Sequence, residues 1–376
     1  MRSEAVACIV VLGLVLVALV GLAPRASAAV VATAAAAAAA AVAAVAAVAA
    51  AAAAGPPRLI GGAPQYSMDR ADAAAPVTGG SRLGLFARVR ALRGKASAEI
   101  KRRLRWFVKR ASPGFELEAS RLALGGGAGD AAVLASLREA WLARDSGAPS
   151  RAPDDAAARL ERARARVDGI PVFPELGAVL GALRAGVGAL EAEFRYLDVG
   201  SSEGSITAAF AADLRLGPDR AFACDPVAQA KESPDYTFRQ SDGNSIPYAD
   251  ADFDFITMFM SAHHFEDPGR MFAEAFRVAR PGAHLLLREH GRGDATAGLY
   301  YDLVHAFYEV VLTPPAAPEA TPGSFALRYA RGPIATYRAP DEWVRIAVAA
   351  GFAFVQASEV LADRFDSVYI LFRRPA

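Results

Sequence analysis

Carboxylates and a glycine-bearing turn stand at the ends of short apolar segments in the second half of the chain. The turn runs from Asp198 to Gly204, and Asp225 and Asp242 end two further segments. A turn of this kind between a strand and a helix leaves backbone N–H groups free, and glycine lets a ligand approach the main chain because it has no Cβ. A carboxylate at the tip of the next strand can accept both hydroxyls of a ribose. The spacing therefore predicts a site for a nucleoside-like ligand.

Two adjacent histidines form a second group that could do chemistry. His263 and His264 follow the apolar segment 252–259, and Ser261 stands just before them. A neutral imidazole can accept a proton near pH 7, so both histidines are candidate catalytic residues. A purely positioning role in the loop is the alternative interpretation.

The residues between these groups predict the elements that must position them. From Phe194 onward, short apolar segments alternate with helical patterns, which is typical of a parallel α/β sheet. We expect a Rossmann-like, seven-stranded, mostly parallel sheet with an antiparallel final strand and helices on both faces. The expected strands are 196–200, 220–226, 238–243, 252–259, 284–289, 352–360 and 367–373, and the expected helices include 205–214, 268–279 and 339–351.

The order of these features resembles the class I S-adenosylmethionine-dependent methyltransferases, in particular the type 11 group. The resemblance covers residues 195–291, about a quarter of the chain. Ser202 is one departure, because the family has the middle glycine of its turn at that position. The matching elements are Asp198 with Gly200 and Gly204, then Asp225, Asp242-Gly243, Asp252-Phe253-Asp254, His263-His264 and Arg280-Pro281-Gly282.

The resemblance implies S-adenosylmethionine as the cofactor and a role for each residue of the turn. Gly200 and Gly204, with Ser202 between them, would let the backbone approach the methionine portion. Asp198 would orient the ammonium group of that portion, directly or through water. The loop that begins at Ser261 would lie beside the transferring methyl group.

The other implied roles concern the nucleoside. Asp225 would hold the ribose hydroxyls, Asp242 would accept from the adenine amino group, and the Gly243 N–H would lie near the ring. The residues alone also allow Asp198 and Asp225 to cap helices, and Asp242 to form an Asx turn. Methyl transfer from a sulfonium is an in-line displacement that depends on alignment, so no protein nucleophile is required. The methyl acceptor stays unidentified.

The N-terminal part of the chain has a different composition. An apolar run from Ala5 to Ala23 follows Arg2 and precedes a small-residue pattern at 26–28, which predicts a signal peptide or membrane anchor over residues 1–28. We therefore expect a secretory or membrane-anchored protein, with a plastid leader as the alternative, and cleavage stays open. Residues 29–81 are alanine-rich low-complexity sequence and linker.

Residues 82–192 are expected to form a basic and helical extension before the methyltransferase domain at 193–376. Basic residues dominate 82–110, where Glu99 is the one acid, and apolar residues are interleaved with them. This stretch predicts either a helix that contacts an anionic membrane or RNA, or a solvated helix with one face on the domain. The aromatic-rich segment 299–312 predicts a helix that serves as core or as a wall of the substrate site.

The remaining composition narrows the classes of function. The two cysteines, Cys8 and Cys224, lie far apart, and the five histidines form no His-Glu-x-x-His pattern, so we expect no metal site. A nicotinamide-dependent oxidoreductase would favour Gly-x-Gly-x-x-Gly, whereas this turn is Gly-x-Ser-x-Gly. A noncatalytic, membrane-tethered binding module with a degenerate methyltransferase fold is a further alternative, because Ser202 departs from the family pattern.

Overall fold

The structure is a computed structural model. It describes residues 84–111, 114–145, 156–185, 193–229, 232–291, 293–312, 321–331, 335–361, 363 and 365–376. The predicted targeting segment at 1–28 and the alanine-rich tract at 29–81 lie outside these residues. Among the residues described, we find no helix with the length and apolar character to cross a membrane. Targeting and localisation stay predictions.

Seven strands form one mixed sheet in the order β3-β2-β1-β4-β5-β7-β6. Strands β1 to β5 run parallel, and β7 runs antiparallel to both of its neighbours. The expected Rossmann-like architecture is therefore confirmed. The strands are β1 (Tyr196–Val199), β2 (Ala221–Asp225), β3 (Thr237–Gln240), β4 (Phe253–Phe259), β5 (Ala279–His290), β6 (Ala353–Ala357) and β7 (Ser367–Arg373).

The first strand lies inside the sheet, between β2 and β4. All four of its residues are buried, as expected for a parallel strand with both faces covered. The chain leaves β1 toward β2 on one side and reaches β4 on the other. Ligands bind at the carboxyl ends of strands where the strand order reverses in this way. The predicted cofactor residues lie at or just beyond the carboxyl ends of β1 to β4.

The segment Arg280-Pro281-Gly282 differs from expectation. We predicted a turn before the fifth strand, but β5 already begins at Ala279 and includes these residues. Ala279 pairs with Phe253, and pairing resumes between His284 and Phe255. The extra residues of β5 bulge out of the ladder, and Gly282 takes a left-handed φ of 85° there.

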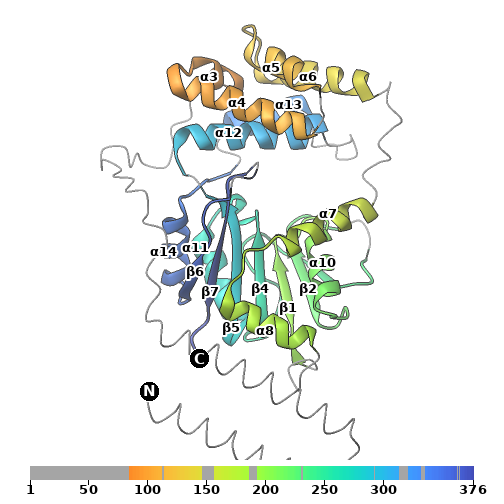
Figure 1. Ribbon diagram of the computed structural model, residues 1–376, viewed down its shortest axis with the longest axis vertical. Coiled ribbons are helices and arrows are strands. Elements are labelled where there is room, and N and C mark those ends of the chain that lie inside the picture. The colour runs from red at the N-terminus through yellow and green to blue at the C-terminus, as the bar shows by residue number, and fades with distance from the viewer. Residues whose placement is uncertain are drawn as a thin grey trace, which may run out of the picture.

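Helices cover both faces of the sheet (Figure 1). Each face has its own hydrophobic core, because side chains alternate between the two faces along a strand. Asp267 starts one covering helix by accepting the Arg270 N–H, with Pro268 in the first turn. One face carries α11 (Pro268–Val278) and α14 (Pro340–Ala349), and the other carries α7 (Ala156–Asp168), α8 (Pro174–Arg184) and α10 (Ser205–Asp213).

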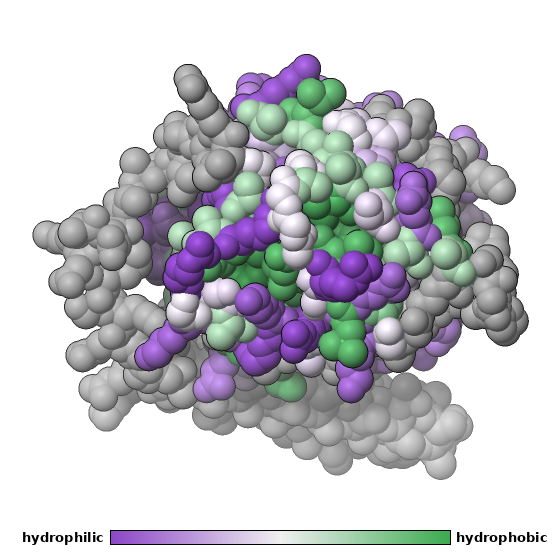
Figure 2. Space-filling view, turned by 90° about the horizontal axis from the view of Figure 1, so that it is seen from above, coloured by the Kyte–Doolittle hydropathy of each residue, from purple (hydrophilic) through white to green (hydrophobic). Residues whose placement is uncertain are grey.

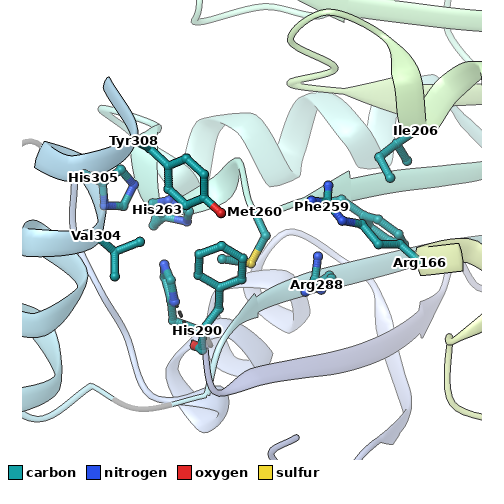
Figure 3. Close-up of a pocket in the computed structure, with 11 residues that line it drawn as sticks. Arg166, Ile206, Phe259, Met260, His263, Arg288, His290, Val304, His305 and Tyr308 are labelled. Carbon is teal, nitrogen blue, oxygen red and sulfur yellow. Dashed lines mark hydrogen bonds between the residues drawn. The ribbon is translucent and has the colours of Figure 1, made fainter. Parts of the chain in front are cut away.

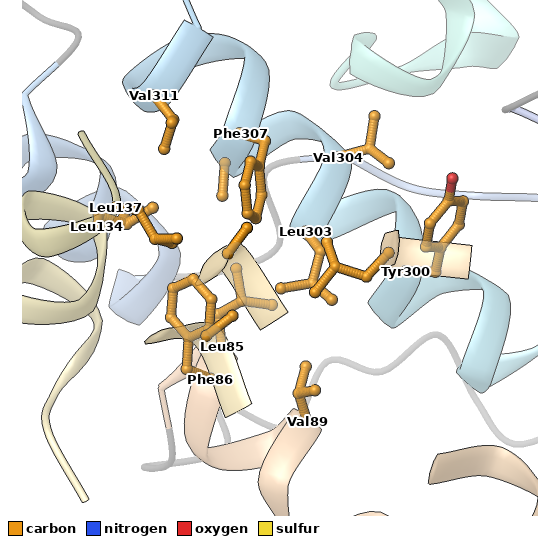
Figure 4. Packing of buried hydrophobic residues seen from close by; sticks show 14 of the residues in the cluster. Leu85, Phe86, Val89, Leu134, Leu137, Tyr300, Leu303, Val304, Phe307 and Val311 are labelled. Atoms are coloured by element: carbon orange, nitrogen blue, oxygen red, sulfur yellow. The ribbon is translucent and has the colours of Figure 1, made fainter. Parts of the chain in front are cut away.

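A separate layer of helices, here called the helical cap, lies above the carboxyl ends of the strands (Figure 1). Its core joins segments far apart in sequence, and Figure 4 shows Phe86, Leu134 and Phe307 packed together. Burial of each such side chain stabilises the fold by roughly 1.5–3 kcal/mol. The cap consists of α3 (Leu85–Ala91), α4 (Gly94–Ala111), α5 (Glu116–Leu124), α6 (Asp130–Asp145), α12 (Ala295–Ala306), the π-helix η3 (Phe307–Leu312) and α13 (Pro322–Arg331).

The predicted extension at 82–192 thus contributes to two layers. Helices α3 to α6 share the cap core with α12, η3 and α13, whereas α7 and α8 pack against the sheet. The cap is therefore built from one segment before the sheet and one inserted between β5 and β6.

The basic stretch forms two helices rather than one. The break falls before Gly94, whose φ is 57°. Ile100, Leu104, Phe107 and Val108 are buried at helical spacing in the cap core. The outer side of α4 carries exposed basic residues, and the cap seen from above shows hydrophilic side chains around a hydrophobic centre (Figure 2). This agrees with a solvated helix that packs one face on the domain.

Candidate active site

Asp198 lies beneath the turn, in the middle of a hydrogen-bonded chain. Its two carboxylate oxygens accept the hydroxyls of Thr257 at 2.7 Å and Thr207 at 2.8 Å. Since the Thr257 proton goes to the carboxylate, the Tyr196 hydroxyl donates to Thr257, at 2.8 Å. The residue is 2% exposed. Asp198 thus supports the turn from below. The contact with the ammonium group of the methionine portion, which the family resemblance implies, stays a prediction.

Burial controls the ionisation of this carboxyl group. Loss of hydration raises the pKa of Asp198 to about 6, although the hydroxyls of Thr257 and Thr207 act in the opposite direction. A nearby cation would favour the charged form and lower this pKa. The ionisation of Asp198 therefore depends on the charge of any ligand bound at the turn.

The turn itself needs left-handed backbone at three positions. Gly200, Ser202 and Gly204 have φ values of 75°, 50° and 78°. A Cβ on Gly200 would collide with the Ser261 side chain, and one on Gly204 would collide with the Tyr236 hydroxyl. Ser202 keeps the backbone conformation that the family's middle glycine provides, at a conformational cost of roughly 1 kcal/mol. The departure from the family pattern has therefore not broken the turn.

Asp225 faces the turn from the tip of β2. One of its oxygens accepts the Ser202 N–H and the other accepts the Val227 N–H, each at 2.8 Å. A carboxylate offers about four lone-pair positions, so each oxygen retains capacity for a further donor. Both N–H groups belong to residues outside the helices, so these bonds brace the turn and are not the helix cap that was the alternative interpretation. They leave the expected ligand role possible.

Asp242 forms the Asx-type turn that was its alternative interpretation. Its Oδ1 accepts the backbone N–H groups of Asn244 at 2.8 Å and Ser245 at 2.7 Å, and the Ser245 hydroxyl at 2.9 Å. These bonds, led by the Asn244 N–H, lower the pKa of the exposed Asp242 carboxyl. Gly243 follows with a φ of 78°, beside Pro226. No bond to Oδ2 is found among the described residues, so this oxygen can serve a ligand.

The loop after β4 places Ser261 and the histidine pair differently. The Ser261 hydroxyl donates to the Val199 carbonyl at 3.0 Å and ties the loop to the turn. His263 is buried in the short helix η2 (Ala262–His264), whereas His264 is exposed. Burial, followed by the neighbouring His264, lowers the pKa of His263 well below its usual value, so its ring is neutral at pH 7.

Glu289 holds His263 in place. Its Oε2 lies 2.7 Å from His263 Nδ1, and it also accepts the backbone N–H groups of His263 and His290, both at 3.2 Å. Burial raises the pKa of Glu289, and the backbone donors of His263 and His290 act against this shift. With the carboxylate ionised, Nδ1 of His263 donates to it and Nε2 carries the lone pair. Glu289 was not among the predicted site residues.

The structure adds two more histidines, His290 and His305, to the predicted pair. The ring centroid of His263 lies 4.8 Å from that of His290 and 5.4 Å from that of His305. Burial lowers the pKa of His290 to about 3 and that of His305 well below its usual value. Their only sequence signal was position, since His290 ends β5 and His305 lies on the inserted aromatic helix.

His263, His290 and His305 line a cavity of about 220 Å³ between the sheet and the cap (Figure 3). Val304, His305 and Tyr308 form one wall, whereas Tyr300 and Phe307 of the same inserted segment belong to the cap core. Tyr308 lies on the π-helix, a distortion frequent at functional sites. The aromatic segment thus contributes to the cap core and to one wall of this cavity. Its role as a wall of the substrate site stays a prediction. Ile206, Phe259 and Met260 line the cavity as well, together with Arg166 and Arg288.

Comparison with known proteins agrees with this geometry. Residues 197–287 match the family described as "Methyltransferase domain", of type 11. An uncharacterised methyltransferase, YcgJ of Bacillus subtilis, is 33% identical over 105 residues, which cover 26% of this chain and 42% of that protein. The 27-O-demethylrifamycin SV methyltransferase of Amycolatopsis mediterranei is 31% identical over 132 residues, covering 31% and 46% of the two chains. The chain thus matches less than half the length of either relative.

Solved structures of the same class are also similar. The crystal structure of Bacillus subtilis YcgJ has 18% identity and a TM-score of 0.34, with 53% of this chain and 98% of that chain covered. A possible histamine N-methyltransferase from Thermotoga maritima has 17% identity and a TM-score of 0.33, with 52% and 87% covered.

The fold and the matched segment define the class. Residues 197–287 form a class I S-adenosylmethionine-dependent methyltransferase domain of the type 11 group. The residues at the carboxyl edge also fit the cofactor that this class implies. Asp225 keeps lone pairs for hydroxyl donors, and Gly200 and Gly204 add no side chain at two positions of the turn.

Proposed function

We propose that the protein transfers a methyl group from S-adenosylmethionine to an acceptor held in the cavity between sheet and cap. The observation that carries the proposal is the turn from Asp198 to Gly204, which faces Asp225 at the reversal of strand order and is followed by Ile206, a residue that lines the cavity. In this proposal Asp225 and Asp242 hold the nucleoside, and the backbone of the turn approaches the methionine portion.

The residues of this chain would act mainly by alignment and exclusion of water. When bound, S-adenosylmethionine supplies an electrophilic methyl group. Ile206, Phe259 and Met260 are apolar residues of the cavity lining and would keep water from the transfer path. Arg166 and Arg288 line the same cavity. His263 is neutral and is the candidate acceptor for a proton released by the methyl acceptor. The cavity of about 220 Å³ favours a small acceptor or the side chain of a larger one.

Calorimetry with the full chain tests the proposal. Saturable binding of S-adenosylmethionine or of its demethylated product is expected, followed by transfer of a labelled methyl group to a component of a cell extract. Mass spectrometry of the labelled product would identify the acceptor. If neither compound binds, the proposed function is wrong, and the noncatalytic alternative gains support.

We also propose that the outer side of α4 contacts an anionic membrane, since a targeting or anchoring segment is predicted at 1–28. Lys101, Arg102, Arg105 and Lys109 are exposed there, and each such charge near an anionic surface contributes about 1 kcal/mol. Vesicles that contain phosphatidylserine should bind the protein, and Lys101→Glu with Arg105→Glu should abolish this binding. Retained binding in that variant, or binding to RNA alone, would contradict the membrane contact.

A further inference from the structure

His263, His264 and His305 form a cluster that their spacing in the sequence did not predict. One ring nitrogen from each of His263, His264 and His305 lies within 4.8 Å of the other two. Three nitrogens at about 2.1 Å from one tetrahedral ion lie about 3.4 Å apart. Modest rotation of side chains, above all of the exposed His264, would close the difference.

Hydrogen bonds at two of these rings indicate which nitrogen carries the lone pair. His263 Nδ1 lies 2.7 Å from Glu289 Oε2, to which it donates when that carboxylate is ionised, and His305 Nδ1 lies 2.8 Å from the Tyr301 carbonyl, which can only accept. Both rings therefore leave Nε2 as the unprotonated nitrogen. A carboxylate or carbonyl behind the distal ring nitrogen is the usual support of a metal-bound histidine.

A third observation points to a missing ligand. His290 is 1% exposed, and its Nδ1 donates to the Phe365 carbonyl at 3.0 Å. Its buried Nε2 has no hydrogen-bond partner among the described residues. His290 lines the same cavity as His263 and His305 (Figure 3). A buried nitrogen without a partner costs about 1–3 kcal/mol, which a metal ion or a metal-bound water would relieve.

We propose that His263, His264 and His305 bind a divalent transition-metal ion of the zinc type, with His290 as a fourth ligand or as the partner of a metal-bound water. Imidazole ligands suit zinc, copper, iron or nickel rather than magnesium or calcium. This proposal replaces the expectation that the protein has no metal site. The spacing of 263, 264 and 305 matches no metal motif, and only the cap brings His305 to the loop after β4.

The position of the ion suggests its role, and this part rests on the proposed function. An ion there would face the cavity assigned to the methyl acceptor. It would occupy the lone pair of His263, so the role of proton acceptor proposed for His263 applies to the site without the ion. The ion would bind an oxygen or sulfur atom of the acceptor and hold that atom toward the turn. Metal binding itself does not depend on methyl transfer.

The test uses the untagged full chain, stripped with a chelator and titrated with Zn²⁺ alone. About one equivalent is expected to bind, and Co²⁺ should give the visible absorption of a nitrogen-ligated ion. His264→Ala should weaken binding by about 100-fold or more, and this exposed position leaves the fold intact. His284→Ala is the matched control, because His284 lies near the other end of β5 and bonds to Glu175.

Two further variants separate ligands from neighbours. Glu289→Gln keeps the shape but removes the acceptor for His263 Nδ1, so binding should weaken by about 10–100-fold. His305→Ala should abolish the Co²⁺ spectrum. Absence of stoichiometric binding, or equal binding by His264→Ala and the unmodified chain, would overturn the proposal. S-adenosylmethionine titrations in parallel keep it distinct from the proposed function, since either ligand can bind when the other does not.

Discussion

The two halves of the sheet's carboxyl edge are built in different ways. On the β1–β3 side, the groups proposed to face the cofactor come from three short turns within residues 198–243, each directly after a strand. On the β4–β5 side, the histidines come from the loop after β4, the end of β5 and an inserted helix of the cap. The first half depends on local backbone geometry, and the second depends on how distant segments pack.

Because of this difference, substitutions in the two halves should affect different properties of the protein. The turn half is held by backbone N–H groups and glycine conformations, so single changes there should alter ligand binding. The histidine half depends on the attachment of the cap to the sheet, so changes in that attachment should alter stability first.

The largest expected effect concerns this attachment. Arg103 on α4 is buried, forms an ion pair with Asp366 before β7, and stacks on Tyr300 with its guanidinium carbon 3.8 Å from the ring centroid. Arg103→Ala removes one partner of a buried pair and should lower the free energy of unfolding by about 3 kcal/mol. Urea denaturation measures this loss.

The neighbouring Arg102→Ala is the control, because Arg102 is exposed and pairs only along the helix with Glu99 in the bonds observed. Its cost should stay below about 0.5 kcal/mol. Similar losses for the two variants would contradict the idea that one buried pair fastens the cap.

The next effect concerns the turn half. Asp225→Ala should weaken S-adenosylmethionine binding by about 100-fold, because it removes a charged acceptor for two hydroxyl groups. Asp219→Ala changes the same residue type at the opposite end of β2, where the side chain is exposed, and should leave affinity unchanged. Equal affinities for Asp225→Ala and the unmodified chain, measured by calorimetry, would remove the ribose assignment.

A smaller effect is expected from pH. The pKa of Asp198 is raised to about 6, so the carboxyl group is mostly charged at pH 7 and mostly neutral at pH 5. A cationic ligand that needs the carboxylate should bind about tenfold more weakly at pH 5 than at pH 7. Asp198→Asn should bind weakly at both pH values. A decrease of the same size in that variant would assign the pH dependence to another group.

The raised pKa of Asp198 also makes the stability of the fold depend on pH, and in the opposite direction to ligand binding. Because the folded pKa of Asp198 lies above the unfolded value, the folded protein binds the extra proton more tightly. Its contribution to stability is therefore present at low pH and is lost as the pH rises through about 6.

The smallest effect concerns Ser202. Its left-handed φ of 50° is a conformation that glycine adopts without cost. Ser202→Gly should stabilise the protein by about 0.5 kcal/mol, after allowance for the extra freedom of glycine in the unfolded chain. Thermal unfolding measures this, and a lower midpoint would show that the serine side chain contributes more than its backbone costs.

Much of the sheet was predictable because its signals are local. Buried strands such as 196–199 and 367–373 are short apolar runs, and their order along the chain is typical of this fold. The segment Arg280-Pro281-Gly282 was misjudged, since proline and glycine signal a turn whether they end a strand or form a bulge within it. Asp242 was ambiguous for a related reason, because an Asx turn and a ligand contact use different oxygens of one carboxylate.

By itself, the sequence determined the class of domain and the turn with its carboxylates, because covalent connectivity places a strand, its turn and the following helix together. Only the tertiary structure decided the other half of the site. The cap joins residues 85–145 to 295–331 through a shared apolar core, and that packing brings His305 to His263. Glu289 reaches His263 through the pairing of β5 with β4. Non-local burial leaves no fixed spacing in a sequence, so a cluster that depends on it becomes visible only in the folded chain.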